Sequence, residues 1–116
     1  MTDTVRAERS RRAYNTYYRQ LMAVRRHLIG MGMPDVGHGG QGYARRITIP
    51  GLNVRVRTNL RRDINKRGRG PVFADMTDGD NRPLIVFEVP THAEDPEEFL
   101  VTMPIQTFVH IMRRNP

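Results

Sequence analysis

The chain has 116 residues, a length typical of one domain built on a single core. It contains no cysteine, which excludes disulfides, thiolate nucleophiles and cysteine-ligated zinc or iron–sulfur sites. The formal net charge is +7, and residues 1–70 carry sixteen cations against four acids, whereas residues 71–116 carry three cations against eight acids. This uneven excess of cations predicts a surface that binds a polyanion, and the expected partner is nucleic acid, either DNA or RNA.

Neither a membrane span nor a secretion signal is expected. The longest apolar run covers only residues 84–87, and residues 1–30 carry charges where a signal peptide needs an apolar stretch. A cytoplasmic location is therefore expected, in keeping with the absence of cysteine. The eighteen arginines against a single lysine are typical of a high-GC genome, bacterial or phage.

Residues 4–29 predict a long amphipathic helix that ends at Gly30, with residues 1–10 frayed when unbound. Apolar residues recur there at three- and four-residue steps, namely Tyr14, Tyr17, Tyr18, Leu21, Val24 and Leu28. Arginines surround this stripe, and Arg11, Arg12 and Arg19 are expected to form a second rim of the binding surface. Residues 30–44 contain six glycines and a proline, which predicts a flexible loop.

A β-hairpin is expected over residues 46–57, with Pro50 and Gly51 at the centre of a type II turn. In a two-residue loop Arg46 faces Arg55, and Arg57 lies on the same outer face. Like charges directly opposite each other destabilise a ribbon unless an anion lies between them. The alternatives are a longer loop that shifts the register, or acidic residues that cover the arginines.

The next segment, residues 59–70, predicts one or two helical turns with an Asn59 cap, Leu60 and Ile64 facing inward, and an end at Gly68. It is the densest basic segment, and beside the arginine ribbon it would extend one cationic patch. The expected nucleic-acid-binding residues of this patch are Arg46, Arg55, Arg57, Arg61, Arg62, Lys66, Arg67 and Arg69.

Residues 72–76 and 84–89 flank the turn-forming residues 77–81 and predict a second hairpin, whose apolar second arm suits a central strand covered on both faces. A short strand over 99–102 and a helix opened by Pro104 complete the chain. The predicted fold is a single α+β domain, residues 1–116. It has a long N-terminal helix, a four- to five-stranded, mostly antiparallel sheet made from the two hairpins, and a C-terminal helix packed on that sheet.

Candidates for catalysis are few. The turn at 78–81 lacks the spacing of a calcium loop, the four histidines form no ligand-spacing motif, and no serine occurs in a nucleophile-elbow pattern. No metal and no cofactor are therefore expected.

One short pattern resembles the restriction-endonuclease-like nucleases, which include archaeal-type Holliday-junction resolvases. It consists of Asp75 on one expected strand, Glu88-Val89-Pro90-Thr91 closing the next, and Glu8 on the preceding helix. The family has an acid on one strand and Glu-x-Lys on the next, which together bind magnesium and orient the attacking water. The resemblance implies that Asp75 and Glu88 could hold a metal, and Pro90 at the lysine position implies a protein that binds rather than cuts.

Three functions thus compete. The first is a small basic nucleic-acid-binding protein without catalysis. The second is an interaction or inhibitor module that docks on an acidic protein partner, as a monomer or a homodimer. The third is a metal-dependent nuclease that uses Asp75 and Glu88.

Overall fold

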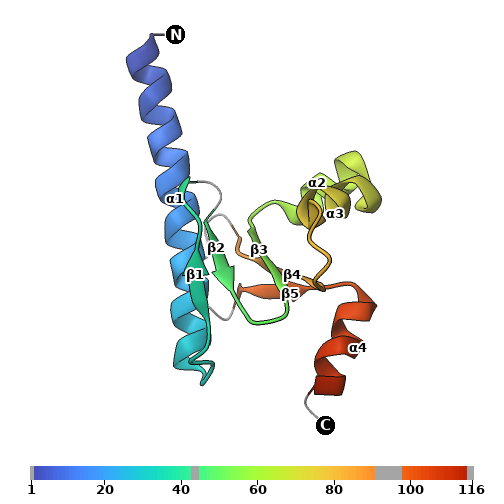
Figure 1. Ribbon diagram of the computed structural model, residues 1–116. Coiled ribbons are helices and arrows are strands. Elements are labelled where there is room, and N and C mark those ends of the chain that lie inside the picture. The colour runs from blue at the N-terminus through green and yellow to red at the C-terminus, as the bar shows by residue number, and fades with distance from the viewer. Residues whose placement is uncertain (1, 43–44, 91–97, 115–116) are drawn as a thin grey trace.

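The structure is a computed structural model that describes residues 2–42, 45–90 and 98–114. It confirms the α+β class, with a long N-terminal helix and a C-terminal helix (Figure 1). In the parts described, no helix is both long and apolar enough to cross a membrane. The elements in chain order are α1 (Asp3–Gly30), β1 (Gly37–Gly39), β2 (Arg46–Thr48), β3 (Asn53–Arg57), α2 (Leu60–Arg67), α3 (Arg69–Thr77), β4 (Leu84–Glu88), β5 (Leu100–Thr102) and α4 (Ile105–Arg114).

Helix α1 follows the predicted apolar stripe in its second half and projects from the molecule in its first half. Leu21 and Val24 are buried, Tyr17 and Leu28 pack around them, and the helix ends at Gly30. Residues 3–13, which we call the arm, are exposed at every position. Figure 1 shows the arm extending well beyond the rest of the fold.

The main sheet has the order β3-β4-β5, with β4 in the centre. Strand β4 pairs in parallel with β3 and antiparallel with β5. All five residues of β4 are buried, which confirms the prediction of a central strand covered on both faces. A parallel pair needs a crossover connection, and α2 and α3 provide it.

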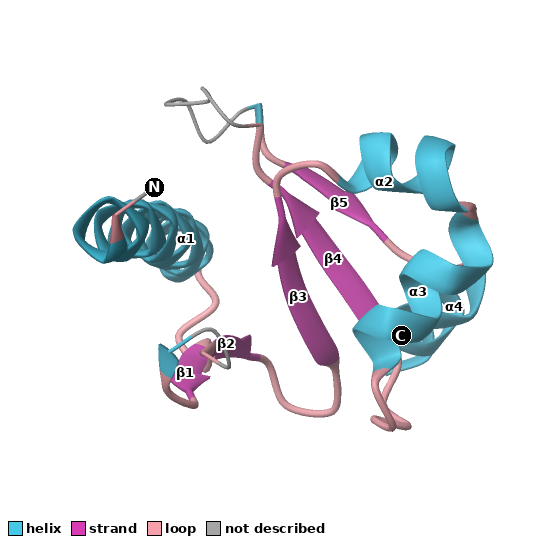
Figure 2. Ribbon diagram, turned by 90° about the horizontal axis from the view of Figure 1, so that it is seen from above, coloured by secondary structure: helices cyan, strands magenta, loops and turns pink. Residues whose placement is uncertain are grey.

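Two apolar clusters lie on opposite faces of this sheet. On one face, Ile85 and Phe87 of β4 and Val89 just after it pack with Leu21 and Val24 of α1. On the other, a second buried cluster joins the sheet to α2 and α3 and consists of Leu60, Val72, Met76, Leu84 and Val86. Figure 2 shows this layering, with α1, β1 and β2 on one side of the sheet and α2, α3 and α4 on the other.

The predicted hairpin over residues 46–57 is wrong, although its turn is confirmed. The Leu52 N–H donates to the Ile49 carbonyl at 3.1 Å, and Gly51 has φ +81°, as a type II turn requires. The chain after this turn enters the main sheet, while β2 pairs with β1 from the glycine-rich segment that was expected to be a flexible loop. Glycine is needed in that ladder, because a Cβ on Gly37 would lie 2.7 Å from the Thr48 hydroxyl oxygen.

The predicted hairpin over residues 72–89 is also wrong. Residues 69–77 form α3, because Val72 and Met76 are one helical turn apart and both are buried against the sheet. Asp78, with φ +41°, ends this helix in the left-handed conformation. Residues 78–83 therefore connect α3 to β4, and the sheet contains a parallel pair that the sequence did not predict.

Helix α4 starts after Pro104 as expected, but four of its apolar residues face away from the sheet, and only Ile111 packs against the core. Thr107 is buried instead, and its hydroxyl donates to the Leu84 carbonyl at 2.8 Å. The apolar residues, which we call the α4 stripe, keep much of their surface in solvent, at Ile105 (76% exposed), Phe108 (53%), Val109 (39%) and Met112 (54%).

Replacing Leu60 with alanine tests the packing of the crossover helices on the sheet. Leu60 is 1% exposed, so Leu60→Ala should lower the free energy of unfolding by about 2–5 kcal/mol through the lost transfer energy and the cavity. Urea denaturation followed by circular dichroism measures it. Lys66→Ala, at an exposed position of the same helix, is the matched control and should change stability by less than about 0.5 kcal/mol. Equal effects of the two changes would contradict this packing.

Candidate nucleic-acid interface

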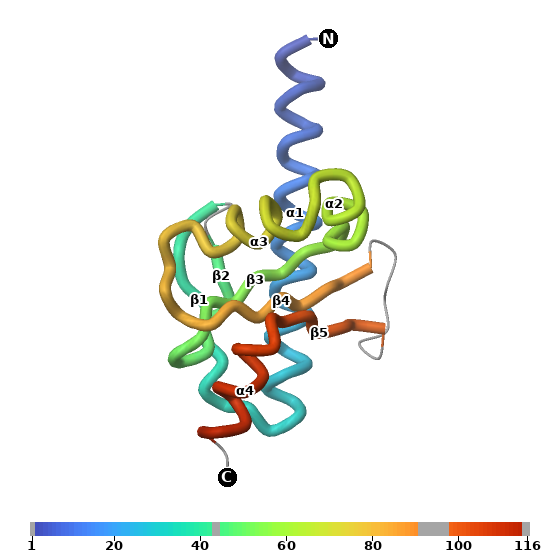
Figure 3. The backbone as a smooth tube through the Cα atoms, turned by 90° about the vertical axis from the view of Figure 1, so that its right-hand side faces the viewer, coloured from blue at the N-terminus to red at the C-terminus, as the bar shows by residue number. Residues whose placement is uncertain are grey.

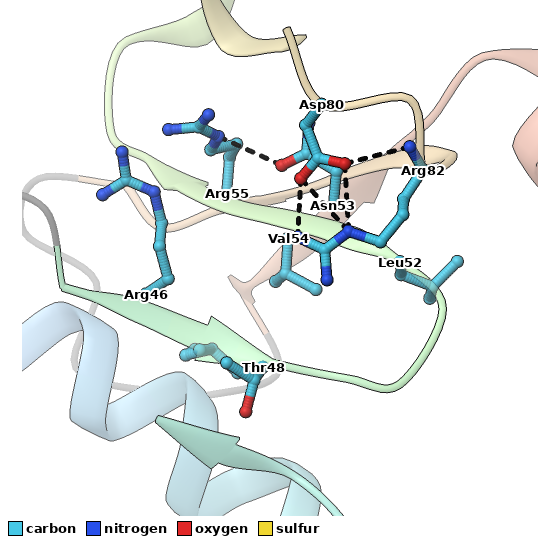
Figure 4. Close-up of a pocket in the computed structure, with 9 residues that line it drawn as sticks. Arg46, Thr48, Leu52, Asn53, Val54, Arg55, Asp80 and Arg82 are labelled. Atoms are coloured by element: carbon cyan, nitrogen blue, oxygen red, sulfur yellow. Dashed lines mark hydrogen bonds and ion pairs between the residues drawn. The ribbon is translucent and has the colours of Figure 1, made fainter. Parts of the chain in front are cut away.

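Arg46 and Arg55 come together although they do not lie on paired strands. Both line a small pocket, with a volume of about 120 Å³, between β2 and β3. On β3 the residues alternate, so that Val54 takes the core face and Asn53 and Arg55 share the other. Figure 4 shows the two arginines beside the Asp80 and Arg82 side chains.

Hydrogen bonds fix the walls of this pocket. Arg55 donates from Nε to Asn53 Oδ1 at 3.3 Å, and the buried Asn53 donates from Nδ2 to the Met76 carbonyl at 3.2 Å. Arg46 donates from Nη1 to the Arg45 carbonyl at 2.9 Å and to the Tyr17 hydroxyl at 3.3 Å. Arg55 thus donates to an amide oxygen, and Arg46 donates to a carbonyl oxygen and a hydroxyl oxygen.

The pocket is electropositive. Partial burial and then the nearby Arg46 charge lower the pKa of Arg55, and Asp78 and Asp80 act in the opposite direction. Asp80 is itself occupied, because Arg82 donates to its two carboxylate oxygens from Nε at 2.9 and 3.2 Å and from Nη2 at 2.6 Å. These bonds lower the pKa of Asp80 from 3.8 to about 2.

Three arginines and one aspartate line the pocket. Its volume of about 120 Å³ exceeds the roughly 10–15 Å³ that one water molecule requires by this measure, so several waters or a small anion fit. The site can therefore hold one anion between two forked donors.

The other predicted cations of the patch fall into two groups. Several are held by acids, in the pairs Arg57–Asp63, Arg61–Glu88 (3.6 Å) and Arg67–Asp75. By contrast, Arg62, Lys66 and Arg69 are exposed, and their side chains have no ion pair with any residue that the structure describes. The basic segment is thus partly neutralised, and three of its cations remain available to a ligand.

The second rim lies on α1, where Arg11, Arg12 and Arg19 are exposed, and Arg6 and Arg9 of the arm are exposed beside them. Figure 3 shows the arm projecting beyond α2 at one end of the molecule and α4 at the other end. Figure 2 shows α1 and α2 on opposite sides of the main sheet, so the arm and α2 carry their exposed cations on two separate parts of the surface.

The two acids of the nuclease-like pattern do not lie on neighbouring strands. Asp75 is on helix α3, exposed and paired with Arg67. Glu88 closes β4, is 7% exposed, and accepts a hydrogen bond from Thr102. Among residues 2–42, 45–90 and 98–114, no three histidine or acidic side chains gather closely enough to hold a metal ion. Thr91, the last residue of the pattern, lies outside the described residues.

Sequence reasoning missed Asn53, Asp80 and Arg82 as parts of the pocket. Asp80 was assigned to the hairpin turn at residues 77–81, and Arg82, just after that turn, was given no role. The parallel pairing of β3 with β4 instead aligns Asn53 with Leu84, which brings the residues just before β4 alongside the start of β3. No local signal in the sequence indicates this neighbourhood.

A larger open groove, of about 720 Å³, lies between the end of α1, the turn at 49–52, the sheet and α4. Its walls are mostly apolar, and they include Leu28, Ile85, Phe87 and Ile111. Apolar walls do not suit phosphates, so the candidate interface does not include this groove.

An anion that binds between Arg46 and Arg55 should stabilise the fold by mass action. In a thermal melt, phosphate at about ten times its dissociation constant should add about 1.4 kcal/mol relative to chloride at equal ionic strength. Arg55→Gln should abolish the gain, whereas Arg69→Gln, which removes an equal charge outside the pocket, should keep it. A phosphate effect that survives in Arg55→Gln would contradict the site.

The Asp80 carboxylate should stay ionised well below the pH at which ordinary aspartates take up a proton. Folding lowers the pKa of Asp80, so the ionised carboxylate stabilises the folded protein at a pH above the pKa that Asp80 has in the unfolded chain. This stabilisation is lost as the pH falls through about 2. Carboxyl chemical shifts in an NMR titration should give a midpoint near 2, and Arg82→Gln should move it back toward 3.8. Arg113→Gln should leave it unchanged, and a midpoint near 4 in the unmodified protein would refute the assignment.

The chain was also compared with known proteins. No family model matches it, and no curated protein or solved structure matches it. A function for this protein is therefore inferred from the charges, contacts and surfaces described above.

Proposed function

We propose that this protein binds nucleic acid through its phosphates and does so without cleaving it. The observation that carries the proposal is the arm, where arginines Arg6, Arg9, Arg11 and Arg12 are exposed in a helix that projects from the fold, against only Asp3 and Glu8. A cationic helix exposed on all sides has no evident role in stabilising its own domain, and it presents its charge to a large anionic partner.

The arm has dimensions that suit a nucleic-acid groove. About eleven helical residues span about 16 Å, and the B-DNA major groove, about 12 Å wide, admits an α-helix. Arg6, Arg9 and Arg12 recur at three-residue steps and share one broad side of the helix. From that side they can reach phosphates, and sequence-independent contacts of this kind account for most non-specific affinity.

The exposed cations of α2 and α3, Arg62, Lys66 and Arg69, provide a second set of phosphate contacts. Figure 2 shows α2 and α3 on the opposite side of the main sheet from α1. The Arg46–Arg55 pocket adds a site where two guanidinium groups can bind one phosphate. Together these groups form a discontinuous cationic surface that suits a bent or flexible phosphate backbone.

The positions of the acids support binding without cleavage. Magnesium-dependent hydrolysis needs carboxylates that converge on the metal and a group that activates or orients water. Asp75 and Glu88 lie on a helix and a strand, and each is paired with an arginine. Pro90 stands where the resembled family has its lysine.

Affinity for nucleic acid should fall steeply with salt, with a log–log slope of about −0.9 for each duplex phosphate neutralised. Fluorescence anisotropy with labelled duplex DNA, single-stranded DNA and RNA at several salt concentrations measures this slope. Arg12→Gln should make it shallower by about one unit, because one phosphate contact is lost.

Arg113→Gln is the matched control, since it removes the same charge from an exposed arginine of α4, the helix that Figure 3 shows at the end of the molecule opposite the arm. It should leave the slope unchanged, so that a local contact is distinguished from net charge. Absence of binding to all three nucleic acids at low salt would overturn the proposal and favour an acidic protein as the partner of this surface.

A further inference from the structure

Helix α4 packs on the sheet through the side that carries Thr107 and not through the side that carries the α4 stripe. Thr107 is 2% exposed and is hydrogen-bonded to β4, and Ile111 packs against the main core. The α4 stripe, which has the strongest apolar spacing of the helix, lies on the other side. An amphipathic helix is normally stabilised by burying its apolar side. In this orientation the α4 stripe stays exposed to solvent.

The exposed fractions of the stripe correspond to on the order of 450 Å² of mostly apolar surface. Patches of this size on small proteins often mark interaction sites. None of the four residues carries a charge or a hydrogen-bonding side chain, so a partner needs only a matching apolar surface.

We propose that the α4 stripe is a dimer interface that pairs with the α4 stripe of a second copy of this chain. A two-fold axis perpendicular to the helices places them antiparallel, so that Phe108 and Val109 lie near the axis and Ile105 meets Met112 of the second copy. Two copies of the stripe are complementary in this arrangement, because the axis passes through the centre of the stripe and each apolar residue contacts an apolar residue of the second copy.

The charges of α4 favour this antiparallel arrangement. Its charged residues are Arg113 and Arg114, both in the last turn. Antiparallel pairing separates the two arginine pairs by about 15 Å, the length of the helix, which exceeds the Debye length of about 8 Å at physiological salt. Parallel pairing would bring four guanidinium groups together and would be opposed by their repulsion.

The area sets the strength of the dimer. Two stripes bury on the order of 900 Å² in total, somewhat below the usual 1,200–2,000 Å² of stable interfaces. The net charge of +7 on each copy also opposes association. We therefore expect a weak dimer, with a dissociation constant in the micromolar range, which is strengthened by salt as the repulsion is screened.

Sedimentation equilibrium on nuclease-treated protein free of nucleic acid tests the dimer independently of the proposed function. The unmodified chain should reach dimer mass at tens of micromolar. Phe108→Glu should raise the dissociation constant by about a hundredfold or more, because it places two carboxylates at the centre of an apolar contact. Met31→Glu changes a residue that is 72% exposed outside α4 and should leave the constant unchanged.

Because the chain contains no cysteine, a single introduced thiol gives a second readout that does not depend on a disruptive charge. Val109→Cys, close to the proposed axis, should form a disulfide between copies under mild oxidation much faster than Met31→Cys. Circular dichroism confirms that the variants are folded. A monomer at all concentrations, equal cross-linking at both positions, or an unchanged dimer in Phe108→Glu would each overturn the proposal.

Discussion

Strands β3 and β4 lie side by side in the same direction, and the rest of the molecule follows from this one pairing. Parallel neighbours cannot be joined by a tight turn, so the chain must leave the sheet, cross one face and return. Here α2 and α3 make that crossing, and their apolar residues cover one face of β4. Because the crossover occupies that face, α1 and the small β1–β2 ladder pack against the opposite one.

The helices at both ends of the chain and the buried strand between them could be predicted from the sequence because their signals are local. The three- and four-residue steps of Leu21, Val24 and Leu28 indicate a helix with one buried side. The apolar run at 84–87 indicates a strand that is buried on both faces. The helix at 69–77 was missed because a short apolar segment contains too few residues to distinguish the helical spacing of apolar residues from the spacing in a strand. Val72 and Met76 fit a helix and a strand equally well until the position of the sheet decides.

The pairing errors have the same physical origin. A type II turn at Pro50 and Gly51 was recognised correctly, yet a turn does not require the strands beside it to pair with each other. Ile47 is buried against α1, so β2 stays with that helix and pairs with β1, while Val54 lies in the main sheet. Arg46 and Arg55 still meet, since both strands border the same pocket, and so a wrong topology left their proximity intact. Asp80 and Arg82 could not have been added without knowing that β4 starts beside Asn53.

The arm also bears on how quickly α1 can order. An isolated helix of about eleven residues is marginal in water, since its first turn must fix several residues for a single hydrogen bond. In α1 that nucleation cost is already met by the half that packs on the sheet, from Tyr17 to Leu28. Each further residue toward Asp3 then adds one backbone hydrogen bond for each residue ordered, and elongation takes on the order of nanoseconds per residue. The first turns can therefore unwind and rewind from the packed half of the helix, and the arm can adjust its length to the surface that it contacts with a small net free-energy change per residue.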